Sequence, residues 1–249
     1  MILIAFYLLI ACVFPDILIN CDVISKKNKY IFAIFDNLTH GIIAFFSWIY
    51  YREAESHLHE IWSFSLIMEA LLCAFFSCII DIDHFICAKS FNIKTVLDYR
   101  QDLYGRPFLH NSALIPFIAI LLFILLKWLK FMPKLLPKNY GILYLLCNAI
   151  EFLIPCLIIA MATHHIRDAI RRGLTFKFFL CRNFNLNNHQ RHFFFLNTNP
   201  LPYFLYITLL IFIPPCLALS VKIYSFLFIQ QSHLSGISQN SKYKPIHLI

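Results

Sequence analysis

Long apolar runs separated by short polar connections dominate the chain. A helix that crosses the hydrocarbon core of a bilayer needs about 20 mainly apolar residues, and six runs approach that length. They are Ile2–Ile19, Ile31–Tyr51, Ile61–Ile80, Ala113–Leu129, Gly141–Ala162 and Leu201–Ile229. Pro15 lies near the end of the first run, and the Pro214-Pro215 pair interrupts the last. We therefore expect about six membrane helices, within a range of five to seven.

Composition supports the membrane as the solvent of this chain. Hydrophobic residues make up 60% of the 249 positions and charged residues 14%, whereas a soluble domain is about half apolar and about a quarter charged. The predicted fold class is all-α, a multi-pass transmembrane helical bundle forming one membrane-embedded domain over residues 1–249. Within it, residues 1–30 form an extra N-terminal membrane segment, and residues 231–249 form a polar tail that we expect to be disordered.

The net charge of +8 has a simple interpretation in a membrane protein. Lysines and arginines collect in the connections, where they meet anionic lipid headgroups and set orientation. No arginine stripe interleaved with aromatic residues exists outside the loops, so nucleic acid is not an expected partner. In a six-helix arrangement, 13 of the 21 basic residues lie in the first, third and fifth connections. The positive-inside rule places these connections in the cytoplasm.

Ionisable residues gather in four places at the ends of the predicted helices. Such residues are costly in a membrane and often mark function. The four clusters are Asp36 with His40, Asp81 with Asp83 and His84, Arg106 with His110, and His164 with His165 and Asp168. The second helix begins on the side where the third ends, the fourth begins there, and the fifth ends there. All four clusters are therefore predicted to face one leaflet, and the charge bias makes it the cytoplasmic one.

The residue types in these clusters suit metal ligation. Neutral imidazole and carboxylate bind zinc or manganese, and such sites often keep a position for water. The candidate ligands are His40, Asp81, Asp83, His84, His110, His164 and Asp168. His164 and Asp168 are four residues apart and share one helix face. Asp81 and Asp83 need a non-helical turn between them, or only one of them binds.

A divalent metal at this position, zinc or manganese, would generate the nucleophile for a hydrolysis by lowering the pKa of its bound water. Asp83 is the candidate general base, and Arg106 is the candidate clamp for a substrate phosphate. The substrate would be a lipid or phosphate ester, and membrane lipids are the expected surroundings. Contact with phospholipid headgroups is the interpretation that we favour for Arg106 and Arg167, and the phosphate clamp is the alternative for Arg106.

Structural interpretations stand beside these chemical ones. For Asp36 a helix N-cap is favoured over a ligand, with the second helix running from there to about His57. Phe32–Phe35 would then be an interfacial approach segment. Glu69 could pair with polar groups between helices. The whole set of polar residues could also be an interhelical hydrogen-bond network that fixes the bundle of a non-enzymatic scaffold or lipid-interacting protein.

Five stretches resemble the transmembrane protein 267 family of eukaryotes. They read DNLTHGIIAFFSW, DIDHFICAKS, RPFLHNSALIP, THHIRDAIRRGL and PLPYFLY, and they lie between Asp36 and Tyr206. This resemblance implies a multi-pass membrane protein.

A second pattern is similar to bacterial inner-membrane proteins predicted to be metal-dependent hydrolases, a group that includes LexA-regulated members. That pattern has an early histidine, then Pro-Asp-x-Asp, His-Arg-Gly-x-Thr-His-Ser and His-x-x-x-Asp. Four positions of this chain match its main elements: His40, Asp81, His110 and His164. Gly105 stands where the pattern has a histidine. Two hypotheses therefore stay open, a hydrolase and a relative that keeps the polar cluster without turnover.

Overall fold

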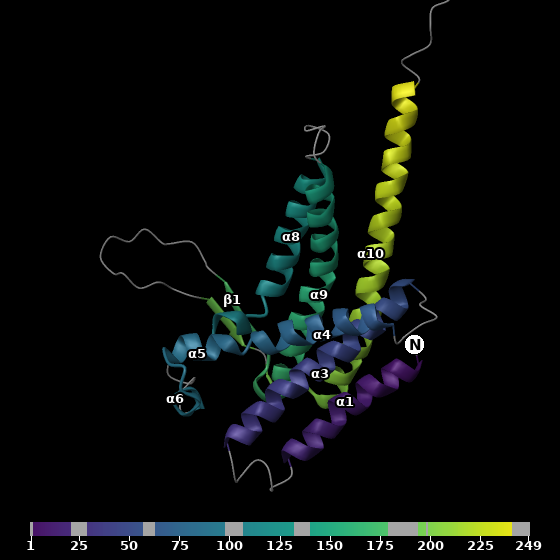
Figure 1. Cartoon of the computed structure of the whole chain (residues 1–249). Coiled ribbons are helices and arrows are strands. Elements are labelled where there is room, and N and C mark those ends of the chain that lie inside the picture. The colour runs from purple at the N-terminus through teal and green to yellow at the C-terminus, as the bar shows by residue number, and fades with distance from the viewer. Residues whose placement is uncertain are drawn as a thin grey trace, which may run out of the picture.

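The computed structural model is a helical bundle (Figure 1) and describes residues 2–20, 29–56, 63–97, 107–131, 140–178, 194–197 and 199–240. Its helices are α1 (Ile2–Asn20), α3 (Lys29–Ser56), α4 (Phe64–Ile79), α5 (Ile82–Ala88), α6 (Ile93–Leu97), the 3-10 turn η1 (Phe108–His110), α8 (Leu114–Phe131), α9 (Tyr140–Arg172) and α10 (Tyr203–Asn240). The all-α prediction is confirmed. One short antiparallel ladder joins β1 (Thr175–Phe178) to β2 (Phe194–Asn197).

Helix α3 is the centre of the bundle, since it contacts α1, α4, α9 and α10. Figure 1 shows α1, α3 and α4 side by side, with the α8–α9 hairpin and α10 projecting beyond them in the same direction. The largest fully buried side chains include Trp48 and Tyr51 of α3 and Tyr206 of α10. These aromatic rings are part of the hydrophobic core that joins α3 to its neighbours.

Four stretches in the described part of the chain are long and apolar enough to cross a membrane. They are Tyr30–Glu55, Phe64–Ala88, Leu145–Ile170 and Tyr203–Ile223, and shorter apolar stretches lie at Ile2–Pro15 and Leu114–Leu129. These six stretches overlap the six predicted runs, but only four of them are long and apolar enough to cross a membrane. Many apolar side chains point outward, among them Phe14, which is 57% exposed, as expected for a protein whose surroundings are lipid tails.

Several predicted helix limits differ from the structure. Helix α3 already begins at Lys29 and continues through residues 32–36, so Asp36 is not an N-cap and Phe32–Phe35 is not a separate approach segment. Helix α9 continues ten residues beyond Ala162 to Arg172. Helix α10 passes through its two prolines without interruption and ends at Asn240. It therefore includes residues 231–240, which we expected to be disordered; 241–249 lie outside the described residues.

Local signals mark where several helices begin and end. Ser63 caps α4, because its hydroxyl oxygen accepts a hydrogen bond from the Leu66 amide at 3.3 Å. Ile80 and Asp81 form a turn before α5, and Ile82 and Asp83 belong to the first turn of that helix. The turn therefore precedes Asp83 and does not lie between the two aspartates. Gly173 ends α9 with a φ of 72°, a conformation that glycine adopts without strain.

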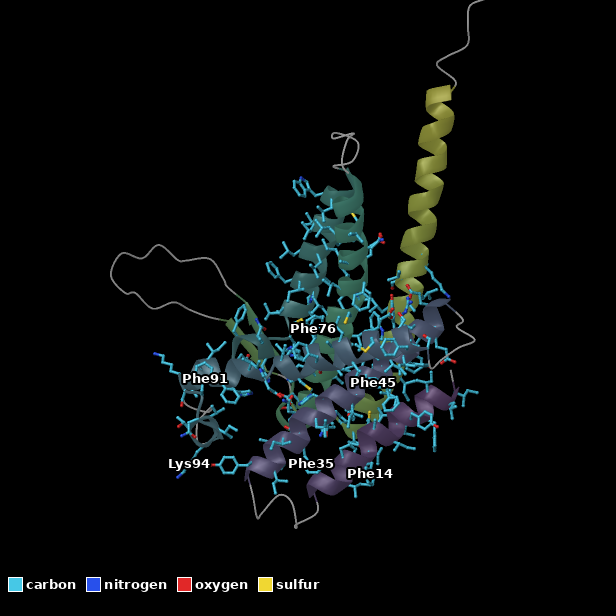
Figure 2. The ribbon with its side chains drawn as sticks, viewed as in Figure 1. Phe14, Phe35, Phe45, Phe76, Phe91 and Lys94 are labelled. Carbon is cyan, nitrogen blue, oxygen red and sulfur yellow. The ribbon has the colours of Figure 1, made fainter. Side chains whose placement is uncertain are left out.

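The segment from α5 to α6 leaves the bundle and presents apolar and basic side chains together. Phe91 is 95% exposed, and Figure 2 shows Phe91 and Lys94 at the outer edge of this segment. Aromatic and lysine side chains are enriched at membrane interfaces. The segment begins at Asp81 and therefore starts beside the polar cluster.

Candidate metal centre

Five side chains from separate parts of the sequence converge inside the bundle. His40 comes from α3, Asp81 from the turn after α4, His110 from η1, and His164 and Asp168 from α9. The three imidazole rings are buried, with relative exposures of 1%, 4% and 0% for His40, His110 and His164. The carboxylates are less buried, 27% exposed for Asp81 and 13% for Asp168. The convergence that helix direction predicted is therefore present in the structure.

Two histidines and Asp81 lie close together at the centre of the cluster. His110 Nε2 lies 3.3 Å from His164 Nε2. The Asp81 Oδ1 oxygen lies 3.3 Å from His110 Nε2 and 3.6 Å from His164 Nε2. These three atoms form a small triangle at the centre of the cluster.

Asp168 links this triangle to His40. Its Oδ2 oxygen lies 3.6 Å from His110 Nε2, and its Oδ1 oxygen lies 3.6 Å from His40 Nε2. The His40 ring stacks on the His164 ring with centroids 3.9 Å apart. Each oxygen of Asp168 therefore faces a different histidine.

Outer hydrogen bonds fix which nitrogens of the two central rings face the cluster. His164 Nδ1 lies 3.0 Å from the Ser77 carbonyl oxygen, which can only accept, so this nitrogen carries a hydrogen. His110 Nδ1 lies 3.2 Å from Asp83 Oδ2, which also accepts from the Leu109 amide at 2.7 Å. Both rings therefore present Nε2 to the centre, as metal-ligating histidines with an outer acceptor do.

The charge environment favours a positive group at His110. Burial alone would lower the pKa of this imidazole, but its hydrogen bonds with Asp81 and Asp83 outweigh that effect and raise the pKa to about 9. The carboxylates around His110 thus attract positive charge, whether that charge is a proton or a metal cation.

The distances fit a divalent metal. Two nitrogens bound at about 2.05 Å to a tetrahedral zinc are about 3.3 Å apart, which is the separation of the two central Nε2 atoms. Imidazole with carboxylate is a donor set that zinc and manganese accept. The side chains could hold such an ion with only small shifts.

The remaining predicted site residues lie around this centre or outside the described part. His84 is at the edge, with Nε2 3.7 Å from Asp81 Oδ1 and a 17% exposed side chain. Asp83 lies behind His110 rather than at the centre. His165 lies 3.3 Å from the Ser112 hydroxyl through Nδ1. Arg106, the candidate phosphate clamp, lies outside the described residues.

Sequence reasoning missed an ion pair next to the cluster. Arg167 NH2 lies 3.6 Å from Asp36 Oδ1, and the Arg167 side chain is only 3% exposed. The expectation that Arg167 meets lipid headgroups is therefore wrong. A signal was present in the spacing, because Asp36 lies one helical turn before His40 and Arg167 lies about one turn after His164. When α3 and α9 pack so that His40 meets His164, Asp36 and Arg167 also come together.

Close packing of α3 against α4 positions Asp81 beside the middle of α3. A Cβ added to Gly41 would lie 2.8 Å from Cys78 Sγ, and Cys78 Sγ is 3.4 Å from the Asn37 carbonyl oxygen. The end of α4 therefore lies beside the third turn of α3. This stagger explains how His40, deep in its helix, reaches Asp81 at the end of another.

A second polar group lies toward the other end of α3. Glu69 of α4 accepts a hydrogen bond from Trp48 Nε1 at 3.2 Å and pairs with Arg52 Nε at 3.1 Å. The expectation that Glu69 pairs with polar groups between helices is confirmed. This group joins α3 to α4 independently of the His/Asp cluster.

Comparison with known proteins identifies a family. No family model and no solved structure matches the chain. The chain is 31% identical to transmembrane protein 267 of Xenopus laevis over 189 residues, which cover 76% of the chain and 68% of the relative. It is 33% identical to the Mus musculus protein over 165 residues, covering 66% and 64%, and 29% identical to the Bos taurus protein over 196 residues, covering 79% and 71%.

The similarity to bacterial hydrolases stays a prediction. The curated relatives are named as a transmembrane protein, and that name states no activity. Their identity and coverage, together with the apolar helices, establish that this chain is a membrane protein of the transmembrane protein 267 family.

Proposed function

We propose that the chain is a membrane-embedded, metal-dependent hydrolase of lipid or lipid-linked phosphate esters. The observation that carries this proposal is the approach of His110 Nε2 to His164 Nε2 at 3.3 Å. Outer acceptors hold both Nδ1 atoms, so two lone pairs would face each other if both rings were neutral. Such an arrangement is unfavourable unless a cation or a proton lies between the rings. The neighbouring Asp81 and Asp168 oxygens supply the negative charge that a divalent cation needs.

The chemistry follows from the residues around the cation position. A bound divalent cation supplies Lewis-acid activation of water and neutralises charge on a phosphate oxygen. His110, His164 and Asp81 Oδ1 would hold the cation, and Asp83 would position His110. We assign the proton-accepting role to Asp81 rather than Asp83, because Asp81 is 27% exposed whereas Asp83 is buried and already accepts two hydrogen bonds.

The hydrolysis balances without a further reactant. The oxygen of a water molecule forms a bond to phosphorus while the bond from phosphorus to the alcohol oxygen breaks. One proton of the water passes to the Asp81 carboxylate and then to the departing alcohol oxygen. The products are the alcohol and the phosphate monoanion or dianion.

The substrate class follows from the position of the cluster. Asp81 follows the end of α4 and His110 precedes α8. The alternation of the helices predicts that these two ends face one leaflet, and basic residues favour the cytoplasmic side. A substrate at this position would present its headgroup to the cluster while its chains remain in lipid. In this proposal Arg106, which precedes η1, binds the phosphate.

A scaffold is the second candidate function, because one observation favours it. The same side chains already connect α3, the turn after α4, η1 and α9 through contacts of 3.3 to 3.6 Å. A network of this kind could stabilise the bundle without any chemistry. In that case Asp→Asn changes, which keep hydrogen bonding, would be tolerated.

One experiment separates the two. Wild-type protein, Asp81→Asn and the control Glu69→Gln are purified in detergent, their metal content is measured by mass spectrometry, and phosphate release from a short-chain phosphatidic acid is followed. The hydrolase predicts bound metal and activity in wild type and Glu69→Gln, and loss of both in Asp81→Asn. Metal-free wild-type protein with unchanged folding of Asp81→Asn would overturn the hydrolase and favour the scaffold.

A further inference from the structure

The cluster contains more metal-binding side chains than a single catalytic ion requires. A catalytic zinc site commonly has three protein ligands and one position for water. Four histidines and two aspartates form a continuous chain of contacts, in which each side chain lies within 3.7 Å of at least one other. They are His40, His84, His110, His164, Asp81 and Asp168.

These six donors divide into two sets of three. His40, His164 and Asp168 offer ligand atoms that all lie within 4.8 Å of one another, and Asp81, His84 and His110 do the same. Each set contains two imidazoles and one carboxylate, and no residue is shared. Each set therefore has three protein ligands, the number that a catalytic zinc site commonly has.

The two carboxylates lie where bridging ligands would. Asp168 directs Oδ1 to His40 of its own set, at 3.6 Å, and Oδ2 to His110 of the other set, also at 3.6 Å. Asp81 contacts both sets through a single oxygen, because Oδ1 lies 3.3 Å from His110 of its own set and 3.6 Å from His164 of the other. A carboxylate with one oxygen toward each of two donor sets is suited to join two cations.

His40 supplies an independent observation. Its side chain is 1% exposed, and Nδ1 has no hydrogen-bond partner among the described residues. A single ion at the His110–His164–Asp81 triangle would leave His40 buried against a carboxylate with no ligand role. An ion in its own set would give a ligand role to Nε2, the nitrogen of this buried imidazole that lies 3.6 Å from Asp168 Oδ1.

We infer that the cluster is a dinuclear centre, with one divalent cation held by His40, His164 and Asp168 and a second held by Asp81, His84 and His110. The inference rests on the metal centre of the proposed function and divides it, because His110 and His164, which share one cation there, each bind a separate cation here. Two cations about 3.5 to 4 Å apart can bind both the attacking and the leaving oxygen of a phosphoryl group. A phosphate ester is therefore favoured over a carboxylic ester as the substrate class.

The test counts ions and measures whether they interact. Full-length protein is loaded with Mn²⁺ in detergent, freed of excess metal, and examined by elemental analysis and electron paramagnetic resonance. We expect two Mn²⁺ per chain and the spectrum of a spin-coupled pair. His40→Asn and His84→Asn each remove a ligand of one set only, and each is expected to retain one uncoupled Mn²⁺. His84 is partly exposed, so its replacement tests the inference even if His40→Asn fails to fold.

The outcomes separate this inference from the proposed function. One uncoupled Mn²⁺ in wild-type protein that still hydrolyses phosphatidic acid would overturn the dinuclear centre and leave the hydrolase standing. A stoichiometry of one that neither His40→Asn nor His84→Asn lowers would also overturn it, because the central triangle would then be the site. Wild-type protein without bound metal would overturn both proposals.

Discussion

Replacing Asp83 by asparagine should reverse the hydrogen-bond direction at His110. Asp83 Oδ2 accepts from the Leu109 amide and from His110 Nδ1, and the ring therefore presents Nε2 to the cluster. In Asp83→Asn, the amide oxygen can still accept from Leu109. The amide nitrogen takes the place of Oδ1, which lies 3.2 Å from His110 Nδ1, and would donate to the ring. His110 would then favour the tautomer with its hydrogen on Nε2, which cannot bind a metal.

The expected magnitude follows from this outer position. Removing an outer partner of a metal-binding histidine lowers metal affinity about 10- to 100-fold, which corresponds to about 1.4 to 2.8 kcal/mol. The fold should persist, because Asp83 is buried but its asparagine replacement has nearly the same volume and still satisfies the Leu109 amide. The effect therefore concerns the tautomer of His110 rather than the packing of η1.

A chelator competition with Zn²⁺ on purified protein measures this affinity. Asp36→Asn is the matched control, because it makes the same chemical change one helical turn from His40, in the pair with Arg167. We expect the control to keep the wild-type dissociation constant. If Asp83→Asn bound Zn²⁺ as tightly as wild type while Asp81→Ala lost binding, His110 would not depend on Asp83, and the argument from outer hydrogen bonds would be refuted.

Three further predictions test packing, protonation and the second polar group. Gly41→Ala places a methyl group 2.8 Å from Cys78 Sγ and should destabilise the α3–α4 contact by about 1 to 3 kcal/mol, measured as a lower unfolding temperature in detergent. Because the pKa of His110 is raised to about 9, a metal must displace its proton, so Mn²⁺ affinity should rise about tenfold per pH unit up to about pH 9; a flat profile would contradict this. Arg52→Met breaks the pair with Glu69, whose side chains are 31% and 24% exposed, and should cost at most about 1 kcal/mol with metal content unchanged.

The apolar pattern predicted the helices well and their ends less well. The six runs are apolar helices in the structure. A segment that lies in lipid must be helical and apolar, and composition alone reveals such a segment. Helix α9 continued to Arg172 because the polar residues after Ala162 are buried against other helices. Among them, His164 and Arg167 have exposures of 0% and 2%. Hydropathy cannot distinguish a polar residue in a loop from one that is paired inside a bundle.

The convergence of the candidate site could be predicted, but not the role of each residue. Helix direction placed His40, Asp81, His110 and His164 at one end of the bundle, and their distances agree with that placement. The separation of Asp83 from the centre depends on the turn at Ile80–Asp81 and on η1, whose backbone geometry no spacing rule specifies. The Asp36–Arg167 pair likewise depends on how two helices cross.

Gly105 was the strongest sequence argument against chemistry, because the bacterial pattern has a histidine there. The arrangement in space weakens that argument. A catalytic ion commonly uses three protein ligands, and the cluster offers six donors without residue 105. His84, which the four-element pattern does not include, lies 3.7 Å from Asp81 Oδ1 and can supply an imidazole to that side of the cluster. The absence of a histidine at one position is therefore compatible with a complete donor set, and the question of turnover depends on metal content rather than on that position.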